Sequence, residues 1–107
     1  MWQEIEKKTK QLDKAVEQLA QNGIDLAEKE KEYKMELCKK ALELKAQEMP
    51  VTLINQVIYG YGDIPLLRLA RDTAQAKYNA NQEFINVLKI ELRILENQFA
   101  REYGNTK

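Results

Sequence analysis

The sequence predicts an all-α protein. The expected fold is a long antiparallel helical hairpin, similar to a coiled coil, with a short helix in the connection. Two such hairpins are expected to assemble into a four-helix bundle dimer. Apolar residues recur every three or four positions along two long segments, the spacing that lines one face of a helix. Charged residues make up 32% of the 107-residue chain, with only four Gly and two Pro, a composition typical of long helices.

The first long helix is expected to run from Trp2 to about residue 47. Asn22 and Gly23 are residue types that commonly end helices, and Asp25 could begin a new one. Both a kink at 22–25 and one continuous helix are therefore compatible with the sequence. The apolar residues form two columns of an irregular heptad repeat: Ile5, Leu12, Leu19, Leu26 and Tyr33 in one, and Trp2, Val16, Leu37 and Leu44 in the other.

The middle of the chain contains a short helix, expected at about 52–59 and capped by Thr52. Pro50 disfavours helical geometry at the residue before it, so the first helix should end before that position. Gly60 and Gly62 are expected to end the short helix. Residues 51–61 are also rich in β-branched and aromatic side chains, but a strand there would have no second strand to pair with.

The last helix is expected from about 64 to 103, and the whole chain is expected to form a single domain, 1–107. Folding back at 48–63 would place Leu44 near Leu67, Leu26 near Ile85 and Leu12 near Phe99. A second apolar stripe lies beside the main one and consists of Val87, Ile90 and Ile94. Because a two-helix hairpin covers only one stripe, these three residues are the predicted oligomer interface, and the first predicted partner is a second copy of the chain.

The charge balance argues against some partners. Lys plus Arg and Asp plus Glu each number 17, so the formal net charge is zero. A dedicated duplex-DNA binder normally carries a basic excess. No stretch approaches the ~18–20 apolar residues that span a bilayer, and the first residues do not resemble a signal peptide. With Cys38 as the only cysteine, these features predict a cytoplasmic protein without a membrane partner.

The residues that most enzymes depend on are sparse. The chain contains no His, which removes the commonest general base, the usual nucleophile triads and most catalytic zinc sites. Glu28, Glu32 and Glu36 share a helix face, but neighbouring lysines favour a solvated, ion-paired face over a metal site. Gly60 to Asp63 lacks the pattern of a phosphate-binding loop. The sequence therefore predicts no catalytic residues, no metal and no cofactor.

A set of aromatic and basic residues is a candidate contact surface for a partner. Tyr59 and Tyr61 flank the turn, and Arg68, Arg71 and Lys77 form the most basic local cluster. Bases of single-stranded nucleic acid stack on aromatic rings beside cations, so this set is a candidate nucleic-acid contact. Asp63 and Asp72 dilute the positive charge, which favours a solvated helix face instead. Nucleic acid is therefore an alternative partner and a protein the favoured one.

Residues from Gly23 to Tyr103 carry a family resemblance. The segments KKALELKAQEMPVTLINQVIYG and LKIELRILENQFAREYG resemble those of small helical proteins encoded by phages and prophages of Gram-positive bacteria. The resemblance implies a setting in the host bacterial cytoplasm, and it supplies no catalytic or binding residues that could be assigned to positions of this chain. It leads us to expect a non-enzymatic protein-interaction module acting in phage DNA metabolism or counter-defence. The alternative is a nucleic-acid-binding accessory protein for recombination or replication.

Overall fold

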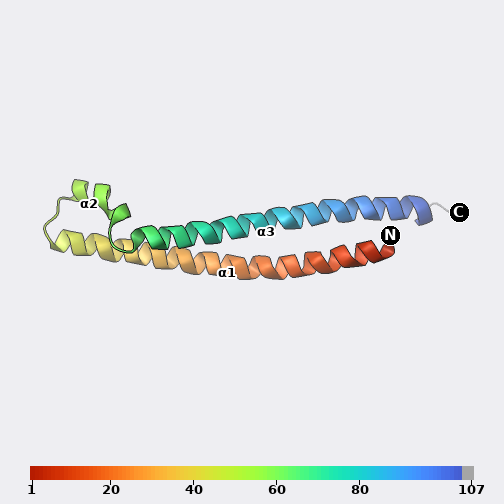
Figure 1. The fold of residues 1–107 in the computed structure, drawn as a ribbon, viewed down its shortest axis with the longest axis horizontal. Coiled ribbons are helices and arrows are strands. Elements are labelled where there is room, and N and C mark those ends of the chain that lie inside the picture. Colours follow the sequence, from red (N-terminus) through yellow and green to blue (C-terminus); the bar gives the residue numbers. More distant parts are fainter. Residues whose placement is uncertain (105–107) are drawn as a thin grey trace. The chain divides into compact units, whose positions relative to one another are not determined.

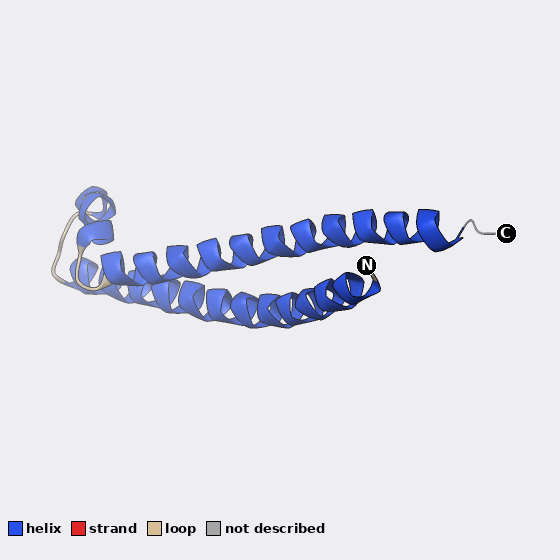
Figure 2. Ribbon diagram, turned by 45° about the vertical axis from the view of Figure 1, so that its right-hand side comes forward, coloured by secondary structure: helices blue, strands red, loops and turns tan. Residues whose placement is uncertain are grey.

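The computed structural model describes residues 1–104, and they are almost entirely helical (Figure 1). The elements are α1 (Trp2–Ala46), α2 (Val51–Val57), the 3-10 helix η1 (Ile58–Gly60), α3 (Ile64–Phe99) and the π-helical turn η2 (Ala100–Gly104). No strand occurs among these residues (Figure 2), which confirms the all-α class. No helix in this range combines the length and the apolar character that crossing a membrane requires.

The helix boundaries differ in detail from those expected. α1 continues through Asn22 and Gly23 as one helix, so the helix break left open by the sequence does not occur. α2 begins at Val51, one residue earlier than expected, and Thr52 does not cap it. Pro50 holds the N-cap position with φ −60° and ψ 143°, and no side chain caps the helix. α3 ends at Phe99, and the last described residues form η2 instead of a further α-helical turn.

The chain forms two compact units. Unit 1 contains Met1–Asn22 and the described residues from Tyr78 onward, and unit 2 contains Gly23–Lys77. In each unit a segment of α1 lies antiparallel to a segment of α3 (Figure 1). In unit 1, Trp2 lies beside Phe99, with ring centroids 5.9 Å apart, and Lys8 pairs with Glu91. In unit 2, Arg71 lies over the ring of Tyr33.

The core of unit 1 is a narrow apolar seam between the two helical segments. Ala15, Ile85 and Leu88 form its centre, and Leu12 and Leu19 pack against them. The predicted seam residues Val16 and Trp2 are instead 50% and 57% exposed. Val16 and Ala15 both fit the spacing to Leu12 and Leu19. Ala15 faces the seam because its column also holds Lys8 and Asn22, whose polar groups find partners on α3.

The core of unit 2 gathers around the end of α1. Leu44, Ile54 and Ile58 form a buried cluster, so α2 and η1 pack onto the last turns of α1 (Figure 1). Ile64, the first residue of α3, is fully buried. This packing corrects the expected pairing of Leu44 with Leu67, because the connection, and not α3, supplies the residues of the Leu44 cluster.

The register in unit 1 also differs from the one expected. Phe99 lies against Trp2 and not Leu12, and Ile85 packs with Ala15. The prediction treated residues 48–63 as a simple reversal that would bring the two helix ends level. The connection instead packs onto the last turns of α1, and Ile85 and Phe99 of α3 meet α1 residues that lie earlier in the chain than predicted.

A Schellman motif ends α1. The Met49 N–H donates to the Leu44 carbonyl at 3.2 Å, and the Glu48 N–H donates to the Lys45 carbonyl at 3.0 Å. Met49 also packs onto the Leu44 cluster, the apolar contact that often accompanies this motif. Glu48 holds the left-handed position with φ 66°, where glycine is the usual residue.

We expect Glu48→Gly to stabilise the protein. A side chain in the left-handed region costs ~1–2 kcal/mol, while the greater freedom of glycine in the unfolded chain offsets about 0.5–1 kcal/mol. The net gain in unfolding free energy should be about 0.5–1 kcal/mol, measured by urea denaturation. Glu43→Gly, inside the helix, is the matched control and should be destabilising. A loss of stability in Glu48→Gly would contradict the assignment of this helix end.

We expect Ile54→Ala to lower the unfolding free energy by ~2–5 kcal/mol, because Ile54 is 6% exposed in the cluster that holds α2 onto α1. Its neighbour Leu53 is 42% exposed, and Leu53→Ala should cost under ~1 kcal/mol. Both values come from chemical denaturation followed by circular dichroism. Equal losses in the two variants would show that α2 is not packed as described.

Candidate functional site

The largest group of exposed apolar side chains on one helix face in unit 1 lies on α3. We call it the outer stripe: Phe84, Val87, Ile90 and Ile94, which are 50%, 49%, 56% and 53% exposed. Three of the four are the residues predicted as an oligomer interface, and the fourth, Phe84, joins them at helical spacing. With 3.6 residues per turn, the centre of the stripe lies roughly 150° around α3 from the buried residues Ile85, Leu88 and Leu92. The stripe therefore faces away from α1.

The outer stripe carries no charged residue among its four members. Glu91, which borders it, is held on the α1 side by Lys8, with Lys8 Nζ 2.7 Å from Glu91 Oε2. Burying a large apolar side chain fully contributes ~1.5–3 kcal/mol. Since each member is about half exposed, covering the stripe would contribute roughly 1 kcal/mol per residue. The arrangement can bind an apolar surface and has no group that could perform a reaction.

The predicted aromatic and basic residues lie in unit 2. Most of them contact each other or other side chains that are close in space. Arg68 lies over the ring of Tyr59 at 5.7 Å, and Lys40 lies over the ring of Tyr61 at 5.8 Å. Arg71 lies closest, 4.6 Å from the centroid of Tyr33. Tyr33 and Lys40 were absent from the predicted set, because each contributes from α1, far away in the sequence.

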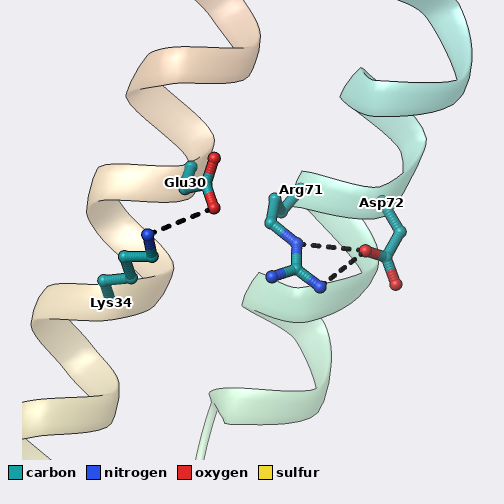
Figure 3. Close-up of polar contacts among 4 residues, drawn as sticks. All are labelled: Glu30, Lys34, Arg71 and Asp72. Atoms are coloured by element: carbon teal, nitrogen blue, oxygen red, sulfur yellow. Dashed lines mark hydrogen bonds and ion pairs between the residues drawn. The ribbon is translucent and has the colours of Figure 1, made fainter. Parts of the chain in front are cut away.

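The charge of Arg71 is compensated within α3. Its Nε and Nη2 atoms donate to Asp72 Oδ1 at 3.0 and 2.8 Å (Figure 3), and this hydrogen bonding raises the pKa of Arg71. Lys40 donates to Glu43 at 3.3 Å, which raises the pKa of Lys40, and Glu36 adds a second carboxylate. On α1, Lys34 pairs with Glu30 at 3.4 Å (Figure 3). Arg71, Lys40 and Lys34 are therefore each matched by an anion.

A shallow groove runs between α1 and α3 in unit 2. It has a volume of about 360 Å³ and contains the predicted contact residue Lys77 on its rim, together with Asp25 and Lys29. Its apolar lining includes Leu66 and Leu69, which are 67% and 63% exposed. The sequence prediction passed over this pair, although two leucines three residues apart and off the seam were a signal for it.

One polar cluster crosses the seam of unit 1. Asn22 Nδ2 donates to Asn81 Oδ1 at 3.0 Å, and Asn81 Nδ2 donates to the Ala15 carbonyl at 3.0 Å. Gln18 Nε2 donates to Asn22 Oδ1 at 2.9 Å. Both asparagines are half-buried and stand where leucine or alanine stands elsewhere along the seam.

Side chains that commonly bind metal ions are not clustered within residues 1–104. No group of three or more His, Cys, Asp or Glu side chains in this range is placed to hold a metal ion. Glu36, one of the three carboxylates on a shared α1 face, pairs with Lys40. Cys38 is exposed on α1.

Comparison with known proteins adds no relative, since the chain matches no protein-family model, no curated protein and no solved structure.

Proposed function

We propose that this chain is a non-enzymatic protein-interaction module that acts as a homodimer through the outer stripe of α3. The observation that supports this most is the exposure of four large apolar side chains, about half of each, on the α3 face turned away from α1. A formal net charge of zero leaves little electrostatic repulsion between two copies. Isologous dimers, in which the same patch serves both copies, are the commonest assembly of soluble oligomers.

In the dimer that we propose, the two outer stripes pack against each other and four helical segments form one bundle. A narrow two-segment seam buries little apolar area for its length, and small domains of this kind often gain stability by association. The outer stripe of a second copy covers the outer stripe of the first, and each copy thereby buries its own exposed apolar side chains.

The remaining exposed surfaces are available for a different protein. In this proposal that partner belongs to phage DNA metabolism or to a host defence, the setting that the family resemblance implies. The matched charges around Arg71 and Lys40 favour a protein over a nucleic acid, since binding to phosphates depends on unpaired cations.

We predict that the protein sediments at twice its 12.5 kDa chain mass at tens of micromolar concentration. Ile90→Glu with Ile94→Glu should weaken the dimer by at least about 3 kcal/mol, roughly a hundredfold, because two carboxylates from each copy would be buried against apolar partners. Analytical ultracentrifugation over a dilution series gives the dissociation constants.

The matched control is Gln82→Glu with Arg93→Gln, which makes the same change in net charge on exposed α3 positions outside the stripe. It should leave the dimer within about threefold of the unmodified protein. A monomer at tens of micromolar, or equal weakening by the two double variants, would refute the proposed interface.

A further inference from the structure

The α3 segment of unit 1 has two apolar faces, and α1 could pack against either of them. One is the seam face, with Ile85, Leu88 and Leu92, and the other is the outer stripe. Both carry large aliphatic side chains at helical spacing. Because apolar burial is non-directional, it gives α1 little reason to cover one face and leave the other exposed. A polar side chain marks the difference, because Asn81 lies on the seam face and points to α1.

The hydrogen bonds of Asn81 reach two places on α1. Its Oδ1 accepts from Asn22, and its Nδ2 donates to the Ala15 carbonyl, one heptad earlier. Gln18 completes the network by donating to Asn22. Within residues 1–104, no buried side-chain nitrogen or oxygen lacks a hydrogen-bond partner. The network is therefore complete when the seam face of α3 lies against α1 and Asn81 stands opposite Asn22.

We propose that the Asn22–Asn81 pair is a pairing-specificity device, which selects the face of α3 that α1 covers and keeps the outer stripe free. If α3 turned its outer face to α1 at the same level, the Asn22 amide would lose Asn81 as its partner and would lie at the level of Ala80 and Phe84. If α3 slid by one heptad, ~10 Å, Asn22 would stand opposite Leu88. Burying an amide without a hydrogen-bond partner costs more free energy than a formed hydrogen bond contributes. The pair therefore acts mainly by destabilising the turned and shifted arrangements.

The same logic applies to pairing between chains. An asparagine at one core position of a coiled coil fixes register and partner at some loss of stability. Without the asparagine pair, the seam face of α3 in one copy and the outer stripe of α3 in another copy could both pack against the same α1 segment. The inference does not depend on the proposed dimer, because it concerns the pairing of α1 with α3 within one chain.

The test uses cysteine pairs as reporters of the face that α1 covers, in a Cys38→Ser background. Lys8→Cys with Glu91→Cys reports the seam face, because Lys8 Nζ and Glu91 Oε2 lie 2.7 Å apart. Lys8→Cys with Ile90→Cys reports the outer stripe at the same level of α3. Each pair is treated with a short bis-maleimide in dilute solution, and the yield of cross-linked monomer is measured by electrophoresis and mass spectrometry.

With both asparagines present, the seam pair should cross-link at least about tenfold more than the outer pair. In Asn22→Leu with Asn81→Leu, the two yields should come within about threefold of each other, while the helix content and thermal midpoint do not fall. A double-leucine variant that keeps the tenfold preference would overturn the inference, because apolar packing alone would then select the face. A double-leucine variant that no longer folds would overturn it too, because the pair would then be a stability requirement.

A rescue variant separates specificity from a general effect of leucine. Asn22→Asp with Asn81→Lys places a complementary polar pair at the same half-buried positions. It should restore the preference for the seam pair to at least about tenfold. Comparable yields from the two reporters in this folded variant would contradict the proposal.

Discussion

The rest of the structure depends on one geometric constraint: α3 has apolar residues on two faces, and one α1 segment can cover only one of them. In unit 1 the covered face holds Ile85, Leu88 and Leu92, and the uncovered face holds the outer stripe. The uncovered face is the source of the functional proposal, since a half-exposed row of large apolar side chains favours association. Because α1 and α3 pair along a narrow seam, few residues determine which face is buried.

Much of the secondary structure was predictable because it follows from local signals. The three-four spacing of apolar residues, Pro50 and the glycines at 60 and 62 place the three main helices to within a few residues. The register of α3 against α1 was not predictable in the same way. It depends on how Ile54 and Ile58 pack onto Leu44, and that packing uses the last turns of α1. The choice of Ala15 over Val16 likewise depends on polar partners across the seam.

The candidate site was predictable in part for the same reason. Val87, Ile90 and Ile94 stand out in the sequence because they repeat at helical spacing beside the main stripe, and all three are exposed. The sequence indicated a basic cluster whose cations are open to a partner, but its residue Arg71 is already paired. Arg71 is matched by Asp72 and covered by Tyr33, and the ring comes from α1, where no sequence pattern links it to α3. The role of Asn81 depends on Asn22, which the fold places opposite it.

The most direct test of this account is the labelling rate of single cysteines at Leu92 and Ile90, each in a Cys38→Ser background. Leu92 is 8% exposed on the seam face, and Ile90 is 56% exposed on the outer stripe. A maleimide reagent should label the Leu92→Cys protein slowly at every protein concentration. It should label the Ile90→Cys protein rapidly in dilute solution and at least about tenfold more slowly at concentrations where the dimer forms. Equal rates for the two proteins in dilute solution, or an Ile90→Cys rate that does not change with concentration, would contradict the account.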